Sequence, residues 1–241
     1  MQYKYIRLTI EQKLATLTLA RADKRNAFTP SMIDEIAHAI NRINQDPHVN
    51  VVLLNAEGPV FCAGMDLKTF EDPELDVLNA GIKHDDRSLG DVMQGLLKPS
   101  IAVLQGDVIA GGFLFILGCT YVLAAEHVRF RLPELNLGIF PFQVMASLAR
   151  VMPQKKVLQL CLDTNYFDVH RAMQLGIVDG IYEQQVVNQK IKYFQEVDVA
   201  VVMAGISALN ELTAISPSEQ YEFLKQRLNA LKIKTDNNKL S

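Results

Sequence analysis

The chain begins with two short segments in which apolar and polar residues alternate, separated by a polar turn. These segments are residues 5–10 and 14–19. Alternation with a period of two is the pattern of a strand with one buried face, so we expect a β-hairpin. Apolar residues then recur at helical spacing over 32–43, after Thr29 and Pro30, which are typical of a helix start. Hairpin followed by helix begins an α/β rhythm.

Two continuous apolar runs follow, and each is the kind of strand that a sheet buries on both faces. They are residues 50–55 and 101–104. The second run leads through a segment of small residues, Ala110-Gly111-Gly112, into the apolar run 113–117, which predicts a buried helix. Small residues let a ligand approach the backbone closely. The free N–H groups and positive dipole end of the helix suit an oxygen that gains negative charge.

Two more features point to a site near Gly111. The segment 58–67 is a second turn rich in small residues after a buried strand, and its N–H groups could line the same pocket. Glu134 places one carboxyl group in an otherwise apolar segment, 132–142. Such a carboxyl is either an acid/base group with a raised pKa or a surface residue in a loop, and the local pattern leaves both open.

The pattern becomes mainly helical after Pro141. Helices are predicted over 144–151, 154–162 and 169–175, a short strand over 177–182, and a last helix from Ser216 to about Leu231 with a frayed end. We therefore divide the chain into an α/β core, 1–183, and a C-terminal helical segment, 184–241. The apolar positions of that segment exceed what a small appendage can bury, which predicts a homotrimer or hexamer; they are Val199, Val202, Met203, Ile206 and Leu209.

Composition narrows the class of protein. The 241 residues are 49% hydrophobic and 21% charged, with a formal net charge of −3 and no basic cluster suited to nucleic acid. No segment reaches the roughly 18 apolar residues of a membrane span, so no membrane partner is expected. Three widely spaced cysteines favour reduced thiols in a cytoplasmic protein over a disulfide framework. The sequence shows no metal-ligand cluster and no dinucleotide-binding glycine motif after the first strand.

Four motifs together resemble the crotonase (enoyl-CoA hydratase/isomerase) superfamily, in order and in spacing, over residues 5–183. They are Asn26-Ala27, Phe61-Cys62-Ala63-Gly64-Met65-Asp66-Leu67, Ala110-Gly111-Gly112 and Pro133-Glu134-Leu135-Asn136-Leu137-Gly138. The resemblance implies a crotonase-like spiral of ββα units around two sheets, with C-terminal helices used in trimer formation. It also implies an acyl-CoA substrate, so that coenzyme A enters as part of the substrate and no separate cofactor is expected.

The resemblance also implies roles for individual residues. The N–H groups of Met65 and Gly111 would form an oxyanion hole for the thioester carbonyl, each donor contributing about 3–4 kcal/mol, with Glu134 as acid/base. Coenzyme A would lie over the loop 23–27, where Lys24 and Arg25 would face its phosphates or else remain solvated charges. The other substrate-binding candidates are Ala27, Ala63, Asp66, Leu67, Gly112, Leu114, Pro133 and Gly138.

Leu114 is where the chain departs from the hydratase pattern. Enoyl-CoA hydratases use two glutamates, and the first would fall at Leu114, which can neither bind water nor carry a proton. One base is enough to move a proton between two carbons, and members that resemble this chain include Δ3,Δ2-enoyl-CoA isomerases. The favoured function is therefore the shift of an enoyl-thioester double bond from Δ3 to Δ2.

Three other functions stay open. One is an enoyl-CoA hydratase. The second is a dehydratase or decarboxylase acting on polyketide-type thioesters of an acyl carrier protein, in which Lys83 or His84 could supply the missing acid. The third is a degenerate acyl-CoA-binding subunit without catalysis. Glu126 ends a predicted strand and is expected to point away from the site.

Overall fold

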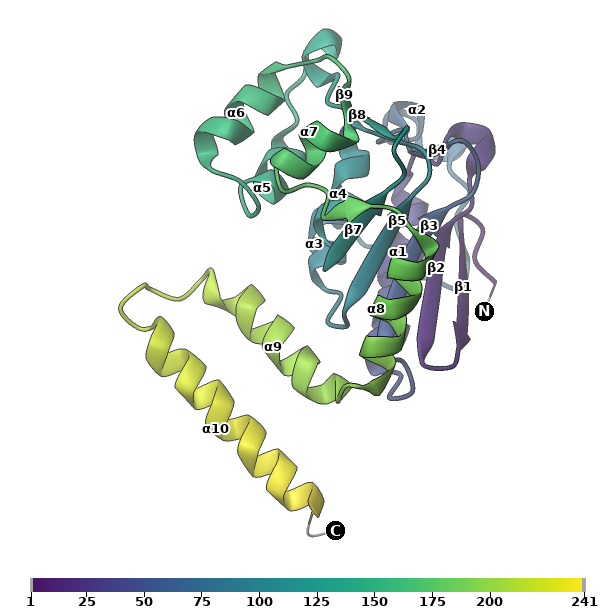
Figure 1. Ribbon diagram of the computed structural model, residues 1–241. Coiled ribbons are helices and arrows are strands. Elements are labelled where there is room, and N and C mark those ends of the chain that lie inside the picture. The colour runs from purple at the N-terminus through teal and green to yellow at the C-terminus, as the bar shows by residue number, and fades with distance from the viewer. Residues whose placement is uncertain (1, 240–241) are drawn as a thin grey trace.

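The computed structural model describes residues 2–239 and is built around two β-sheets (Figure 1). The first has six strands in the order β1-β2-β3-β5-β7-β10, and the second has four in the order β4-β6-β8-β9. The first contains β1 (Ile6–Glu11), β2 (Leu14–Leu19), β3 (Val51–Ala56), β5 (Ser100–Leu104), β7 (Tyr121–Ala124) and β10 (Gly180–Ile181). The second contains β4 (Val60–Cys62), β6 (Asp107–Ile109), β8 (Arg129–Arg131) and β9 (Phe167–Asp168). The expected α/β class is confirmed.

The predicted hairpin forms the edge of the larger sheet. β1 and β2 pair antiparallel from Ile6↔Leu19 to Glu11↔Leu14, and the turn residues Gln12 and Lys13 have positive φ angles. Every later pairing in this sheet is parallel, beginning with β2 on β3. Parallel strands need long crossovers, which here carry the helices and the irregular segments.

Helices cover both faces of the larger sheet, which explains the unbroken apolar strands. In β5, Ala102 and Leu104 belong to the main core, whereas Ile101 and Val103 belong to a second cluster. That second cluster includes Val187 of α8, and the main core includes the apolar stripe of α1. Figure 1 shows α1 and α8 on opposite faces of the sheet.

Most predicted helices are confirmed, with boundaries shifted by a few residues. The α-helices are α1 (Pro30–Gln45), α2 (Leu67–Glu71), α3 (Leu89–Gln94), α4 (Phe113–Leu117), α5 (Phe142–Leu148), α6 (Gln154–Leu162), α7 (Val169–Gln174), α8 (Gln184–Glu196), α9 (Val199–Leu212) and α10 (Gln220–Lys239). Four 3₁₀-helices are η1 (Ala22–Lys24), η2 (Pro73–Leu75), η3 (Ala110–Gly112) and η4 (Glu134–Leu137). Thr29 caps α1 as expected, since its Oγ1 accepts the Met32 N–H.

Two predicted boundaries are wrong. The strand expected over 177–182 shrinks to β10, because the N–H of Ile177 bonds back to the Ala172 carbonyl and so closes α7 instead of joining the ladder. The last helix does not fray after Leu231 but continues to Lys239, consistent with the absence of glycine and proline there. The last two residues of the predicted frayed end, 240–241, lie outside the described residues.

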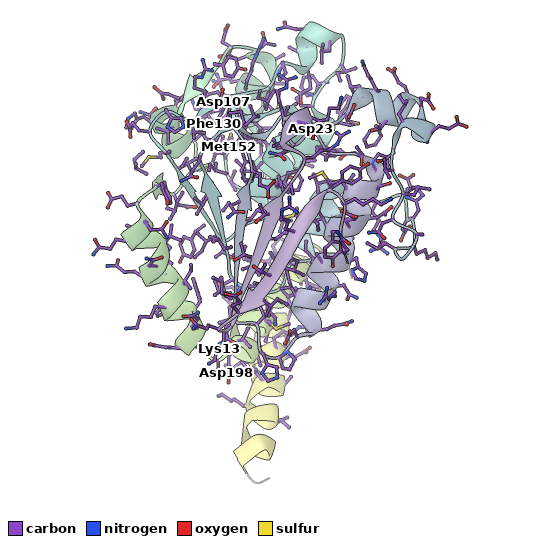
Figure 2. The ribbon with its side chains drawn as sticks, turned by 90° about the vertical axis from the view of Figure 1, so that its right-hand side faces the viewer. Lys13, Asp23, Asp107, Phe130, Met152 and Asp198 are labelled. Atoms are coloured by element: carbon purple, nitrogen blue, oxygen red, sulfur yellow. The ribbon has the colours of Figure 1, made fainter. Side chains whose placement is uncertain are left out.

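The C-terminal helices differ in how they contact the body. α8 is fastened to the hairpin turn, where Lys13 Nζ donates to the Gln195 carbonyl at 3.0 Å. Figure 2 shows Lys13 and Asp198, the N-cap of α9, at the same end of the molecule. α9 and α10 pack on each other and extend away from the sheets (Figure 1). No helix within residues 2–239 has the length and apolar character needed to cross a membrane.

Candidate active site

The turn after β4 presents the Met65 amide to one side of the chain. Phe28 and Met65 form an isolated parallel bridge, in which the Phe28 N–H donates to the Gly64 carbonyl at 2.8 Å. The Phe28 carbonyl accepts from the Asp66 N–H at 2.9 Å. In a parallel ladder, the residue between two bonded neighbours turns its own N–H and C=O to the opposite side. The Met65 N–H therefore points away from Phe28.

A second turn, η3, brings the Gly111 amide beside the first. Gly111 packs against Phe28 so closely that a Cβ at this position would lie 2.8 Å from the ring. A Cβ on Gly112 would lie 2.8 Å from the Cys62 carbonyl oxygen. The glycines of Ala110-Gly111-Gly112 are thus required by packing, independently of any ligand.

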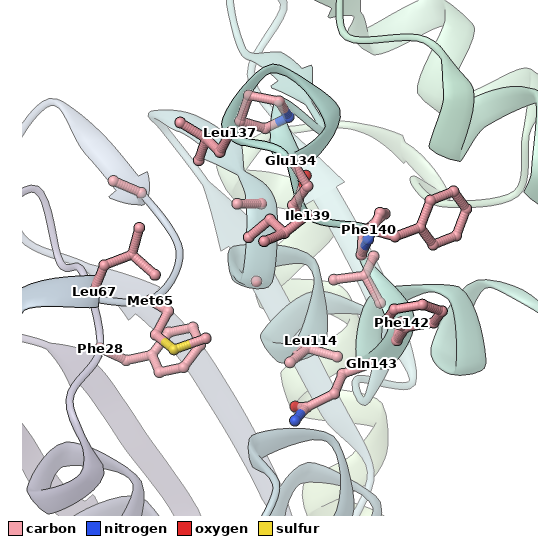
Figure 3. Close-up of a pocket in the computed structure, with 16 residues that line it drawn as sticks. Phe28, Met65, Leu67, Leu114, Glu134, Leu137, Ile139, Phe140, Phe142 and Gln143 are labelled. Atoms are coloured by element: carbon pink, nitrogen blue, oxygen red, sulfur yellow. The ribbon is translucent and has the colours of Figure 1, made fainter. Parts of the chain in front are cut away.

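The two turns meet at the wall of one cavity. The Met65 amide nitrogen lies 3.8 Å from the position that a Cβ on Gly111 would occupy, and the Gly111 nitrogen lies 3.2 Å from the corresponding position on Gly64. Met65 and Gly111 both line a cavity of about 330 Å³, a size suited to a small ligand. Figure 3 shows Met65 and Phe28 on one side of this cavity and Glu134 on another.

Glu134 enters the cavity from the first position of η4. Its side chain is buried, and its Oε2 has no hydrogen-bond partner within the described residues. Burial raises the pKa of this carboxyl above the ordinary glutamate value, although its own backbone N–H acts in the opposite direction. Removing a carboxylate from water disfavours the charged form, so this group can hold a proton more readily than a solvated glutamate.

The remaining wall is almost entirely apolar. Leu114, in the first turn of α4, is 3% exposed and lies in the cavity wall. Among the described residues of this wall, Glu134 and Gln143 alone have polar side chains. The others are Phe28, Ala63, Met65, Leu67, Ala110, Gly111, Leu114, Pro133, Leu137, Ile139, Phe140, Pro141, Phe142 and Val144. A single ionisable group in an apolar, amide-lined cavity suits proton transfer on a bound neutral group.

A family model described as enoyl-CoA hydratase/isomerase matches residues 9–237. The chain belongs to the enoyl-CoA hydratase/isomerase family. Its fold is similar to the crystal structure of an enoyl-CoA hydratase from Shewanella pealeana, with a TM-score of 0.82 and 22% identity, covering 96% of this chain and 89% of that one. The crotonase-like fold with a C-terminal helical segment is therefore confirmed.

Two curated relatives of this enzyme family are similar in sequence. A hydroxycinnamoyl-CoA hydratase-lyase of Pseudomonas fluorescens is 27% identical over 183 residues, which is 74% of this chain. A mitochondrial enoyl-CoA hydratase domain-containing protein 3 of Danio rerio is 27% identical over 162 residues, which is 67% of this chain. The matched stretches span 66% and 56% of the length of these two relatives.

Seven of the predicted site residues line the cavity of this family member, and six do not. Those that line it are Ala63, Met65, Leu67, Gly111, Leu114, Pro133 and Glu134. Those outside its wall are Lys24, Arg25, Ala27, Asp66, Gly112 and Gly138. Gly112 packs against Cys62 behind the η3 turn, and Gly138, with φ of +72°, ends η4 in the left-handed conformation.

The loop that carries Lys24 and Arg25 is held rigidly next to the cavity. Asn26 is fully buried, and its Nδ2 donates to the carbonyls of Glu57 and Val60. Arg21 donates to the Ala27 carbonyl and to the Asp66 carboxylate, each at 2.7 Å. The Asp66 carboxylate is thus engaged by Arg21 and fixes the loop against the Met65 turn, while Lys24 and Arg25 remain exposed.

Three other candidates lie away from the cavity. His84 pairs with Asp34 at 2.7 Å beside a separate cavity near the start of α1, and this hydrogen bond raises the pKa of the His84 imidazole. Lys83 is exposed in the same segment. Glu126 is exposed and pairs with His170, in agreement with the expectation that it points elsewhere.

Sequence reasoning did not find Gln143. Its signal is weak, because a lone glutamine after the apolar segment 132–142 looks like the polar face of a helix. Only the close approach of the first turn of α5 to Leu114 places its side chain in the cavity wall (Figure 3).

Proposed function

We propose that this protein is an enoyl-CoA isomerase that shifts the double bond of a 3-enoyl thioester to the 2 position. The observation that carries the proposal is the pairing of one buried carboxyl, Glu134, with an apolar residue, Leu114, at the place where hydratases carry their first glutamate. A double-bond shift needs one base that takes a proton and gives it back. Hydration needs a second group that holds water.

The proposed reaction has two proton transfers. The thioester carbonyl accepts hydrogen bonds from the Met65 and Gly111 N–H groups, and the Glu134 carboxylate removes a proton from C2. The electron pair of the broken C–H bond moves into the C1–C2 bond, giving a dienolate with its negative charge on the carbonyl oxygen. Glu134 then returns the proton to C4, which leaves a C2–C3 double bond and restores the carbonyl. The atoms of substrate and product balance without a co-reactant.

The environment of Glu134 supports both transfers. Because burial raises its pKa, the protonated form that exists between the two steps is less costly than in water. Leu114 offers no polar group that would hold a water at its place in the wall, where that water could compete for the proton. A positioned general acid/base contributes typically about 10²–10⁴-fold to rate.

Hydratase activity is the second candidate, and the names of the relatives favour it. Both relatives carry "hydratase" in their names. For this chain, hydration of a 2-enoyl thioester would require water to be held without a carboxylate at position 114. A dehydratase or decarboxylase acting on a carrier protein has less support, since neither Lys83 nor His84 lines the cavity. A non-catalytic acyl-CoA-binding subunit would have no use for the buried carboxyl of Glu134.

A side-by-side assay separates these functions. The purified protein is given 3-hexenoyl-CoA and 2-hexenoyl-CoA, and products are followed by chromatography. We expect conversion of the 3-enoyl thioester to the 2-enoyl thioester, with hydration of the latter slower by about 10² or more, as loss of an acid/base group would dictate. Rapid hydration without isomerisation would contradict the proposal, and inertness toward both would favour a binding subunit.

A further inference from the structure

Gln143 is the second polar side chain of the active-site cavity, and the proposed reaction gives it no role. Its Oε1 accepts a hydrogen bond from Ser88 Oγ at 3.3 Å. Ser88 is itself fixed as the N-cap of α3, because its Oγ accepts the Gly90 N–H at 3.2 Å. With its oxygen engaged in this way, the amide has two N–H donors left on Nε2, and these form no hydrogen bond within the described part of the chain.

The position of Gln143 relates it to the acyl chain rather than to the reacting carbons. In Figure 3, Glu134 and Gln143 lie at opposite ends of the cavity wall, with Leu114 between them. A thioester whose carbonyl meets the Met65 and Gly111 amides has its first carbons at Glu134. The rest of its chain passes along the apolar wall of Leu114 and Val144, and Gln143 comes at the end of that wall.

A purely hydrocarbon chain would fit this end of the cavity poorly. The side chain of Gln143 is exposed on the cavity wall, so its N–H groups are open to water until a ligand covers them. An alkyl chain that displaced this water would leave the donors unpaired in an apolar wall, and an unsatisfied buried donor is costly. A site that offers a hydrogen bond discriminates most strongly against ligands that lack the matching group.

We propose that the acyl group taken by this cavity carries a hydroxyl or carbonyl oxygen near its far end, and that Gln143 is the specificity-determining residue that donates to it. Ser88 positions the amide for this contact. The inference rests on the proposed function only in that the cavity binds an acyl thioester, and it holds whether the bound thioester is isomerised or hydrated.

The test measures binding of two saturated thioesters, which cannot react. Hexanoyl-CoA and its 6-hydroxy derivative are titrated by calorimetry into the wild type, into Gln143→Met and into Gln154→Met. Methionine keeps the length of glutamine and removes its donors. Gln154 is exposed at the start of α6 and does not line the cavity, so it is the matched control.

We expect the affinity ratio of the hydroxylated to the plain thioester to fall by about 5-fold or more in Gln143→Met, the effect of leaving one hydroxyl unpaired. The ratio should stay at the wild-type value in Gln154→Met. Gln143→Leu, which also lacks the donors, is measured in the same way and should show the same fall. It keeps the test valid if methionine perturbs the fold.

Two results would overturn the inference, and they differ in what else they overturn. An equal ratio in wild type and both Gln143 variants, with hexanoyl-CoA still bound, removes Gln143 as the specificity residue and leaves the proposed function intact. Failure of the wild type to bind either thioester removes both proposals together.

Discussion

At the residue scale, the carboxyl of Glu134 is unusual because it is buried among apolar side chains and its Oε2 has no hydrogen-bond partner among the described residues. An unpaired buried polar atom lowers the free energy of unfolding by about 1–3 kcal/mol. A chain that only needed to fold would do better with an apolar residue at this position. The buried carboxyl fits the proposed role of Glu134 as the acid/base group.

Replacing Glu134 with glutamine should separate catalysis from binding. Glu134→Gln keeps the shape of the side chain but removes the base, so kcat for isomerisation should fall by at least about 10². The dissociation constant for hexanoyl-CoA should change little, because the amides of Met65 and Gly111 remain. Glu126→Gln, at an exposed glutamate paired with His170, is the matched control and should keep wild-type kcat. Full isomerase activity in Glu134→Gln would show that another group is the base.

The pH dependence of activity should reflect the burial of Glu134. Glu134 must be deprotonated to act as the base, so kcat/KM falls as the pH drops through the pKa that Glu134 has in the folded protein. Because burial raises that pKa, the acid limb should lie above the ordinary glutamate value of about 4.3. A profile of kcat/KM against pH, which reports the pKa values of the free enzyme, measures this limb directly. A limb at or below the ordinary value would mean that a solvated carboxyl limits the rate.

Which site residues the sequence predicts depends on how local their signal is. Gly111 and Met65 lie in small-residue turns after buried strands, and Glu134 is a lone charge in an apolar segment, so each stands out in its own neighbourhood. Gln143 and Phe28 do not, because their place in the cavity follows from long-range packing. For Asp66, the sequence motif that contains it can be recognised, but its ion pair with Arg21, 45 residues away along the chain, cannot be predicted.

At the element scale, the η3 turn has no spare volume. A methyl group on Gly111 would clash with the Phe28 ring, so Gly111→Ala must displace either the ring or the turn. Either movement would misdirect the N–H that we propose as an oxyanion donor, so we expect kcat to fall by about 10² or more. Gly205→Ala is the control, since Gly205 lies in α9 with nothing within 4 Å of its Cβ position and alanine favours a helix. Normal kcat in Gly111→Ala would argue against a catalytic role for this amide.

The helices and buried strands were predictable as elements, whereas their boundaries and partners were not. α1 is predicted by the helical period of its apolar residues, and β3 and β5 are predicted by their continuous apolar runs. The short strands β4, β6, β8 and β9 are not predictable in this way, because two or three residues are too few to show a period. The smaller sheet was therefore implied by the family resemblance and not by the local pattern.

At the scale of the whole molecule, α9 and α10 leave apolar side chains without cover. Leu209 of α9 is 64% exposed, and Leu228 and Ile233 of α10 are 51% and 63% exposed. The two helices pack on each other, and these apolar side chains remain exposed in a single chain. Such a surface is typical of an interface between subunits.

We therefore expect a homotrimer or hexamer in solution. Light scattering at micromolar concentration should give three or six times the mass of one chain. Leu209→Lys should shift the mass toward the monomer, because it places a charge in the interface, whereas Leu158→Lys, at another exposed leucine on α6, should leave it unchanged. A stable wild-type monomer would contradict the expectation.

The bridge between Phe28 and Met65 links the loop that carries Lys24 and Arg25 to the turn that carries the Met65 amide. The strand-like segment that ends the Lys24–Arg25 loop is hydrogen-bonded on both sides of the Met65 amide. If this loop binds the nucleotide end of the substrate, as the family resemblance implies, the same segment also sets the direction of the Met65 amide that we propose polarises the thioester carbonyl. A truncated pantetheine thioester, which cannot reach that loop, would then show lower turnover as well as lower affinity. In this arrangement, contacts at the distant end of the carrier would control the chemistry at the thioester.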